Sequence, residues 1–434
     1  MLNKKARVFL ASLMVSAMVF AACTPGEGGG TTAEQNAGTS TGGGAATTSN
    51  LPPVRIGALL PLTGDDALDG QNQRNAHEFA VERINAAGGI AALGGAPIEI
   101  VWGDTQGSVE IGNAEIERLI VNENVVAILG AFHSGVTLSA VRIAEQYQVP
   151  FLNPNALSVE ITQQGFAYTF QTTPTTFDLT RMQGEVVSYL SERFGTDVNT
   201  IGIIRNDGFI GNQMINGWQE HLPKQGFEIV VDAVFPPAAT NIQSAVLSLI
   251  SADPDVVVSQ ANAQEALLVI RTFRELDWWP RYGFVAAGAG YSNPDVLSGL
   301  GELAEGIIIV NDWFPWNNRP GNSEELNAAF RARYGTDMIA NANTTYAATW
   351  ILKEALEQAG VADPVVLGET MRNLHLVGGV TEFMYDFVRF NEIGLNEGTV
   401  GLAAQVQNGE LMTIWPQADA IVDPIWPVVH WSNR

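Results

Sequence analysis

One short stretch of the sequence carries groups suited to binding an anion. The apolar run Val125–Gly130 predicts a buried strand, and Ala131–Thr137 leads from it directly into a predicted helix. Ser134 therefore places a hydroxyl, and Gly135 a backbone N–H, at a helix N-terminus, where a carboxylate is favoured. The alternative is that Ser134 only caps the helix, because serine is a favoured cap. Thr137 is a further candidate, although its hydroxyl also suits a bond within the first helical turn.

The next candidate, Asp69, could supply a negative charge. Asp69 ends the polar loop Thr63–Asp69, directly before a helix predicted over Gly70–Ala87. A carboxylate there can pair with an ammonium or accept from a hydroxyl. The alternative, favoured by the predicted start at Gly70, is that Asp69 is the helix N-cap. The two roles can coexist because a carboxylate has several acceptor sites.

The patterns of the common enzyme classes are missing. The 5 histidines do not stand at metal-ligand spacing, and the only cysteine is Cys23. His133 and Ser134 are neighbours, but no G-x-S-x-G turn surrounds this serine, so a catalytic triad is not indicated. Gly288-Ala289-Gly290 begins a dinucleotide pattern, but Asn293 stands where its last glycine belongs. We therefore predict a protein that is not an enzyme and that uses no cofactor or metal.

Composition and charge narrow the possible class of protein further. The chain has 22 basic and 46 acidic residues, a net charge of -24 that repels nucleic acid and anionic lipid. Hydrophobic content of 46% and charged content of 16% are typical of a packed soluble globule. A length of 434 residues exceeds what one core usually organises, so we expect two domains.

The N-terminus reads as a targeting segment. Three basic residues precede the apolar run Val8–Phe20, which is too short to span a bilayer comfortably. Small residues then precede Cys23, which resembles a bacterial lipobox whose cysteine is acylated. We predict a lipoprotein signal peptide over 1–22 and a flexible Gly/Thr/Ser tether over 23–50. The alternative is an ordinary signal peptide in which Cys23 is incidental.

Strand and helix patterns alternate along the rest of the chain, which predicts the α/β class with parallel sheets covered on both faces. The predicted strands cover 54–60, 98–102, 125–130, 150–152, 201–205, 228–235, 255–259, 283–286 and 306–312. After several helices, the tail is predicted to form strands at 383–385, 388–390, 401–407 and 411–415. The dipeptide Asn408-Gly409 predicts the turn between the last two strands.

Five stretches, in order, resemble the type I solute-binding proteins of ABC importers, the branched-chain amino acid group. They are IGALLPLTGDDALDGQNQRNAHEFAVERINAAGGI from Ile56, GAFHSGVTLSAVRIAEQYQVPFLNPNA from Gly130, YTFQTTPT from Tyr168, NPDVLSGLGELAEGIIIV from Asn293 and AAQVQNGELMTIWP from Ala403. The resemblance implies two doubly wound, Rossmann-like lobes that close around a ligand in the cleft.

The resemblance also implies where the chain is divided. It places three crossovers near Gln171–Thr173, Ala287–Ala289 and Gly378–Val380. Lobe 1 is then expected to consist of 51–172 and 289–378, and lobe 2 of 173–288 and 379–434.

In the first lobe, the resemblance places Ser134 against the acidic end of the ligand. It expects the loop Asn153–Ser158 to contribute Asn155 and the backbone of Ala156. Leu157 stands where many members carry threonine, and Asp69 stands where an aromatic is frequent. The first of these departures puts a standard α-amino acid ligand in question.

In the second lobe, the resemblance places Phe209 over the ligand, with Ile210 as the alternative one position later. The other alternative is that Phe209 packs in the core. Asn262, in the loop after the strand that ends at Ser259, is expected to face the cleft. Tyr291 is a candidate in a loop where amino acid binders carry an acid for the ammonium, and this loop has none. Trp313 and Trp316 either line the cleft mouth or are buried by packing; packing is favoured.

The function implied is that of an extracytoplasmic, membrane-anchored lipoprotein, expected to be a monomer. It would capture an amino acid, amide or carboxylate and present it to ABC permease and ATPase subunits. One alternative is a ligand-sensing receptor of the same fold, which a neighbouring sensor kinase gene would favour. A remoter alternative is an envelope hydrolase.

Overall fold

Two large β-sheets organise the chain, and β11 (His375–Leu376) and β12 (Val388–Arg389) form a small two-stranded one. The computed structural model describes residues 51–338, 341–379 and 382–433. Cys23, the predicted lipidation site, lies outside them, as do the predicted signal peptide and tether. The first sheet has the strand order β2-β1-β3-β4-β5 and is parallel throughout. Its strands are β1 (Val54–Leu60), β2 (Ile98–Asp104), β3 (Ile128–Gly130), β4 (Phe151–Asn153) and β5 (Thr169–Gln171).

The second sheet has the order β14-β13-β10-β9-β8-β6-β7, in which β6 to β10 are parallel and β13 and β14 are antiparallel. Its central strands read as unbroken apolar runs because helices cover both faces. Its strands are β6 (Thr200–Asn206), β7 (Glu228–Phe235), β8 (Val256–Gln260), β9 (Gly283–Ala287), β10 (Ile308–Asn311), β13 (Leu402–Gln407) and β14 (Glu410–Trp415). The predicted Asn408-Gly409 turn joins the last two, with both residues at positive φ.

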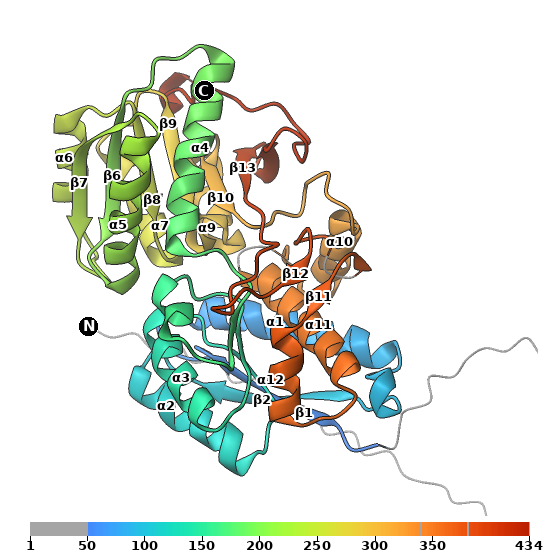
Figure 1. The fold of residues 1–434 in the computed structure, drawn as a ribbon. Coiled ribbons are helices and arrows are strands. Elements are labelled where there is room, and N and C mark those ends of the chain that lie inside the picture. The colour runs from blue at the N-terminus through green and yellow to red at the C-terminus, as the bar shows by residue number, and fades with distance from the viewer. Residues whose placement is uncertain (1–50, 339–340, 380–381, 434) are drawn as a thin grey trace, which may run out of the picture. The chain divides into compact units, whose positions relative to one another are not determined.

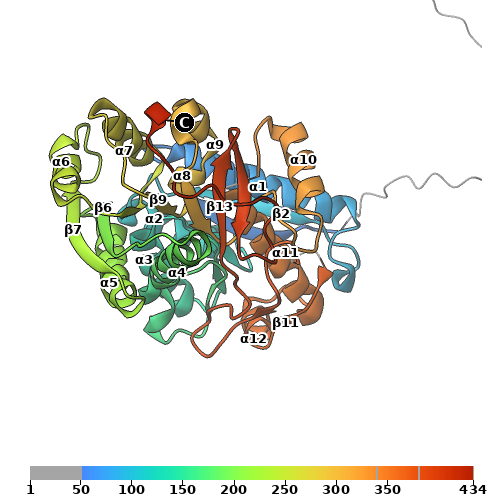
Figure 2. The same cartoon turned by 90° about the horizontal axis from the view of Figure 1, so that it is seen from above.

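Helices flank both sheets, as the α/β prediction required. They are α1 (Ala67–Ala86), α2 (Val109–Glu117), α3 (Ser134–Gln146), α4 (Thr176–Phe194), α5 (Phe209–Lys224), α6 (Gln243–Ala252), α7 (Ala263–Glu275), α8 (Ala289–Ser292), α9 (Pro294–Leu300), α10 (Ser323–Tyr334), α11 (Asn341–Ala359) and α12 (Pro364–Arg372). Figures 1 and 2 show α4 and α5 on one face of the second sheet and α6 and α7 on the other. This arrangement follows from right-handed crossovers between parallel strands.

The first passage between the sheets lies where the sequence predicted it. β5 ends at Gln171, and Thr175 caps α4, the first helix on the second sheet. Thr175 forms a capping box with Asp178, because each side chain bonds the backbone N–H of the other residue.

The second passage does not lie at Ala287–Ala289, as the resemblance had implied. β10 (Ile308–Asn311) follows that point and pairs in parallel with β9, with Ile308 opposite Val285. The apolar residues of β10 are buried within the second sheet. The chain therefore stays on this sheet for one strand more than the resemblance had implied. The passage comes after β10 and before α10, whose Phe330 packs edge-on against Phe79 of α1.

The third passage lies later than the predicted Gly378–Val380, of which Val380 is outside the described residues. The segment before β13 is still bonded to the first sheet, because Asn396 N donates to Gln171 O over 2.9 Å. Thr399 Oγ1 then donates to Thr172 O over 3.3 Å. The third passage therefore runs beside the first.

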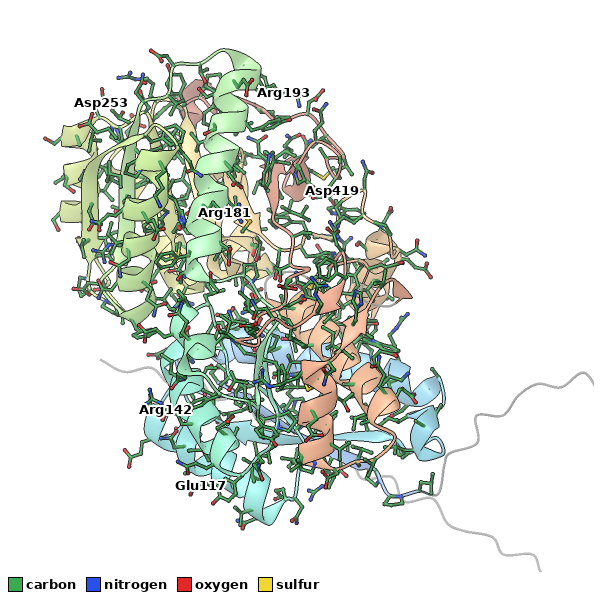
Figure 3. All side chains as sticks on the ribbon, in the orientation of Figure 1. Glu117, Arg142, Arg181, Arg193, Asp253 and Asp419 are labelled. Atoms are coloured by element: carbon green, nitrogen blue, oxygen red, sulfur yellow. The ribbon has the colours of Figure 1, made fainter. Side chains whose placement is uncertain are left out.

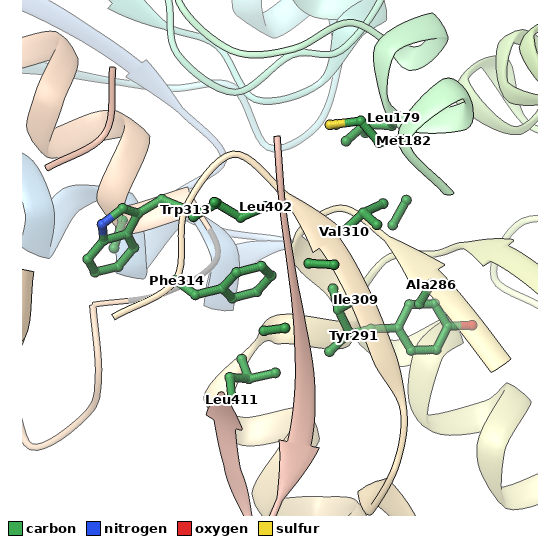
Figure 4. Packing of buried hydrophobic residues seen from close by; sticks show 14 of the residues in the cluster. Leu179, Met182, Ala286, Tyr291, Ile309, Val310, Trp313, Phe314, Leu402 and Leu411 are labelled. Atoms are coloured by element: carbon green, nitrogen blue, oxygen red, sulfur yellow. The ribbon is translucent and has the colours of Figure 1, made fainter. Parts of the chain in front are cut away.

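Apolar side chains fill the space between each sheet and its helices, as Figure 4 shows around Ile309, Val310 and Leu402. The charged side chains labelled in Figure 3 are exposed, except that of Asp419, which is half-buried. Of the helices that the structure describes, none is long and apolar enough to cross a membrane.

Candidate ligand-binding site

The start of α3 forms as the sequence predicted, but its cap is different. β3 ends at Gly130 and α3 begins at Ser134, so the cap position belongs to His133. Ser134 is 4% exposed, and its Oγ accepts from Ser158 N over 3.2 Å. The capping alternative is therefore wrong, and the hydroxyl keeps its own hydrogen for donation. Gly135 is half-buried beside it, in the first turn, where backbone N–H groups have no partner within the helix.

Backbone strain marks the turn before α3. Phe132 has a φ of 84°, a left-handed conformation that a bulky residue adopts only when its surroundings enforce it. Its ring packs edge-on against His133 at a centroid distance of 4.9 Å. His133 Nε2 in turn lies 2.8 Å from Asp66 Oδ2. These contacts fix the turn that sets the direction of α3.

Thr137 is occupied within its own turn. It is fully buried, its Oγ1 donates to His133 O over 3.0 Å, and it accepts from Ala131 N over 3.2 Å. Its donor is used, so the structure favours the alternative given for this residue, a bond within the first turn.

Asn153, which the sequence did not single out, holds the second loop. Its Oδ1 accepts from the backbone N–H groups of Asn155 (3.1 Å) and Ala156 (2.8 Å). Its Nδ2 donates to Ala156 O over 2.7 Å and to Gln171 Oε1 over 3.1 Å. Both backbone polar groups of Ala156 are thus engaged by Asn153, although the carbonyl retains a second lone pair.

Asn155 lies in a buried polar network that reaches distant helices. Its Nδ2 donates to Gln73 Oε1 over 2.9 Å and to Thr345 Oγ1 over 2.8 Å. Its Oδ1 accepts from Thr344 Oγ1 over 2.6 Å. Both amide hydrogens are used, so the structure gives Asn155 a role in joining its loop to α1 and α11.

Asp69 is not an N-cap, because α1 begins at Ala67 and the cap position belongs to Asp66. Gly70 follows it, and a Cβ there would lie 2.0 Å from Pro61 O. This close approach brings the first turn of α1 against the end of β1 and leaves Asp69 only 3% exposed.

The carboxylate of Asp69 is held in polar but largely neutral surroundings. Its Oδ1 accepts from Asn341 Nδ2 over 3.2 Å. Burial, and secondarily the charge of Asp66, raises the pKa of Asp69 to about 7, while the Asn293 side chain and His133 oppose this shift. Asn293 follows α8 on the second sheet, so groups from the carboxyl ends of both sheets meet at Asp69.

At the second sheet, Phe209 and Asn262 lie at helix starts after β6 and β8. Phe209 opens α5 and is 45% exposed, whereas Ile210 packs against the core. Asn262 is exposed and caps α7, where Glu265 Oε2 accepts from its N–H over 3.1 Å. Glu265 also accepts from Asn206 Nδ2, and its burial raises its pKa. The cap accounts for the position of Asn262 without a ligand.

Tyr291 lies in the core below this edge (Figure 4). It is 1% exposed, its ring packs edge-on against Phe284, and its hydroxyl lies 2.9 Å from Ser259 Oγ. These contacts leave its hydroxyl partnered. Trp313 is also 1% exposed and donates to Ser323 Oγ over 3.1 Å, so the packing alternative is confirmed. Trp316 is half-buried.

A group of fully buried polar side chains was missed. In the described part of the chain, Asp312, Asn293 and Asn343 each bury side-chain N or O atoms that have no hydrogen-bond partner, although the Asn293 side chain lies near enough to Asp69 to lower the pKa of that carboxyl. The first of these directly follows β10, at the carboxyl end of a parallel strand. Ser134 was selected because it follows a buried parallel strand. Asp312 also follows such a strand, and it would have been selected if β10 had been predicted to lie in the second sheet.

Family membership is decided by a match over most of this fold. Residues 53–399 match the periplasmic binding protein family. The chain belongs to this family. A Leu/Ile/Val-binding protein homolog of Brucella suis is 29% identical over 377 residues, which is 85% of this chain and 92% of that protein. A second such homolog, from Brucella abortus, is 26% identical and covers 86% and 93%.

Solved structures show the same fold. A leucine-binding protein of Thermotoga maritima has a TM-score of 0.72 at 20% identity, covering 86% of this chain and 99% of that one. A substrate-binding protein of Streptococcus pneumoniae in complex with isoleucine has a TM-score of 0.73 at 20% identity, covering 84% and 100%. A solute-binding protein of R. palustris in complex with benzoate has a TM-score of 0.72 at 21% identity, covering 86% and 98%.

These comparisons confirm the predicted family, and the topology of this periplasmic binding protein confirms the predicted fold class. Its relatives are binding proteins and not enzymes, so it is a substrate-binding protein and not an enzyme. In the described ranges, no three His, Cys, Asp or Glu side chains are grouped so that they could hold a metal.

Proposed function

We propose that this periplasmic binding protein is a lipid-anchored, monomeric, extracytoplasmic subunit of an ABC importer. It captures a small polar organic ligand between the carboxyl ends of its two sheets and presents it to the permease and ATPase subunits. The observation that carries this proposal is Asp69, a buried carboxylate that accepts from Asn341 of α11 and whose pKa is also influenced by the Asn293 side chain, which follows α8 beside the second sheet. Ligands bind beyond the carboxyl ends of strands in open α/β sheets.

A second contact supports the proposal that the carboxyl ends of the two sheets lie close to each other. Gln213 of α5 donates to Ser158 Oγ over 2.8 Å, and Ser158 N donates to Ser134 Oγ. The hydroxyl hydrogen of Ser134 and the first N–H groups of α3 are suited to a carboxylate. Isoleucine and benzoate, the ligands named for two similar structures, both carry one.

The proposal is tested by a thermal-shift screen of the purified protein against amino acids, amides and carboxylates, followed by Ser134→Ala. A ligand that binds only the folded state raises the Tm. For a carboxylate ligand, we expect Ser134→Ala to weaken binding about 10-fold or more, the effect of removing a hydrogen bond to a charged group. The control is Ser188→Ala. The hydroxyl of Ser188 donates to Gly184 O within α4. Equal affinity in wild type and Ser134→Ala would contradict this role for the serine.

The lipid anchor is tested separately on Cys23. We expect mass spectrometry of the N-terminal peptide to show a diacylglyceryl group on this cysteine and cleavage before it. Cys23→Ala should then release the protein from the membrane fraction. An unmodified cysteine on the mature protein would contradict the anchor and leave the ligand-binding proposal standing.

A further inference from the structure

We propose that this protein has a second binding site, separate from the candidate ligand-binding site, that holds an organic cation with an apolar body. The site is a cavity of about 470 Å³ between α9, the loop after β10 and the hairpin of β13 and β14. None of the candidate ligand-binding residues lines it. The inference concerns a different molecule from the ligand described above, so it does not rest on the proposed function.

Sheet register places the hairpin end of this cavity away from the candidate ligand-binding site. Ile308, the first residue of β10, pairs with Gln405, near the end of antiparallel β13. The hairpin turn therefore lies beside the amino ends of the parallel strands. Glu305 holds the turn there, because its carboxylate accepts from the N–H groups of Asn408 (3.0 Å) and Gly409 (2.5 Å). The candidate ligand-binding residues follow the carboxyl ends of strands, so the cavity is not an extension of their site.

Apolar side chains form much of the lining. Leu297 of α9, Pro315 and Leu411 of the hairpin (Figure 4) all contribute to it. Trp316, for which the sequence left cleft lining and core packing open, is half-buried and also lines this cavity. A cavity of this volume suits a small organic molecule, and apolar walls favour one with an apolar body. A tryptophan ring, in addition, attracts a cation over its face.

The charges around the cavity select a cation. Among the described residues that line it, none is basic. Glu302 and Glu410 are exposed lining residues, and neither forms an ion pair within the described ranges. Asp337 is already used, because it accepts from Asn327 Nδ2 over 2.8 Å and from Arg331 Nε over 2.6 Å. Two uncompensated carboxylates beside apolar walls attract a positively charged molecule and repel an anion.

A buried hydroxyl on the same face of the hairpin has no partner. Leu411 and Thr413 are two positions apart on β14, so their side chains lie on one face of the sheet. Thr413 is 0% exposed, and its Oγ1 has no hydrogen-bond partner among the described residues. Its backbone N–H donates to Trp316 O over 3.2 Å, which holds the tryptophan beside the hairpin. A buried hydroxyl without a partner is unfavourable, and a bound molecule with a hydrogen-bonding group would satisfy it.

The surface around the cavity favours a small molecule over a protein partner. In the described ranges, no exposed large apolar side chain belongs to α9, to the loop after β10 or to the hairpin. The apolar surface is therefore confined to the cavity. A protein partner would need a wider apolar patch around it.

The test is calorimetry at low salt with probes that differ in charge but little in shape. The amines are 2-phenylethylamine, tryptamine and hexylamine, and their neutral counterparts are 2-phenylethanol, tryptophol and 1-hexanol. The double variant Glu302→Gln/Glu410→Gln removes the two charges, and Trp316→Leu removes the ring. The Tm of each variant is measured, so that unfolding is not mistaken for lost binding.

Glu110→Gln/Glu228→Gln is the matched control. Both residues are exposed, at the start of α2 and of β7, and neither forms an ion pair in the part of the chain that the structure describes. This double variant changes the net charge by the same amount as the cavity variant and does not touch the cavity. Its affinity for the amines should stay within about twofold of wild type.

We expect at least one amine to bind wild type, and its alcohol to bind about fivefold more weakly or less tightly still. Glu302→Gln/Glu410→Gln should weaken amine binding about 5- to 30-fold and leave the alcohol within about twofold, because only the amine interacts with the two charges. Trp316→Leu should weaken binding of both compounds, by about 3- to 10-fold for the amine.

Three results would each overturn the inference. They are the absence of binding by every amine, equal affinity for an amine and its alcohol, and an amine affinity that neither cavity variant changes. An amine that occupies the candidate ligand-binding site gives the last result, because Glu302, Glu410 and Trp316 do not line that site. The proposed function is tested by Ser134→Ala and stands whichever of these results is found.

Discussion

The ligand-free protein should lose about 3 kcal/mol of stability between pH 5 and pH 8. Burial raises the pKa of Asp69 and of Asp312 to about 7 in the folded protein, against 3.8 for a free side chain. The unfolded chain releases both protons near pH 4, whereas the folded chain keeps them until about pH 7. The folded state therefore binds more protons across this window, so its stability falls as the pH rises and levels off above pH 7.

His77 opposes part of this fall. It is fully buried, and burial lowers its pKa from 6.5 to about 3. Below pH 6.5 the unfolded chain gains a proton that folded His77 does not take up, so this residue makes stability rise with pH up to 6.5. Two carboxyl groups against one imidazole leave a net fall that is nearly uniform from pH 5 to about pH 6.5 and becomes shallower from pH 7 upward.

Urea unfolding at pH 5, 6, 7 and 8 measures this dependence. The double variant Asp69→Asn/Asp312→Asn is the comparison, because it removes both titrations and should show stability rising with pH up to 6.5. A wild-type stability that is constant or rises from pH 6.5 to pH 8 would show that these carboxyl groups titrate normally.

Asn153→Leu should cost about 3–5 kcal/mol and abolish ligand binding. Asn153 is fully buried and makes four hydrogen bonds, to Asn155 N, to both backbone groups of Ala156, and to Gln171 Oε1. Leucine has a similar volume but leaves two buried N–H groups and one carbonyl without this partner, and each costs about 1–3 kcal/mol. The loop that carries Asn155 and Ala156 would then lose its conformation.

The control for this prediction is Asn373→Ala. Asn373 is an exposed residue at the end of α12 whose side chain donates to Glu369 O. Such a surface change should stay within about 0.5 kcal/mol. Urea unfolding gives the stabilities, and calorimetry with the ligand found in the screen gives the affinities. An Asn153→Leu protein that unfolds like wild type would show that other contacts hold the loop.

The sequence alone determined the class of fold and the places where polar groups leave the strands. Apolar runs such as Val256–Val258 identify buried parallel strands, and the amphipathic stretches between them identify the covering helices. Ser134 and the loop from Asn153 were found because both directly follow such strands. These inferences succeed because strand, helix and turn signals are carried by residues that are neighbours in the chain.

Only the tertiary structure decided which of these groups have partners. Thr137 is satisfied within its turn, but Asn155 bonds Thr345 and Asp69 bonds Asn341, across 190 and 272 positions of the chain. The order of strands is equally non-local: β10 reads as a buried strand in isolation, and only its pairing with β9 brings Asp312 to the carboxyl edge. Local sequence patterns determine whether an element is a helix or a strand and which of its faces is buried. Which elements lie beside it depends on the burial of apolar surface over the whole fold. The tertiary structure therefore decides which partners a polar group has, and whether that group is free to bind a ligand.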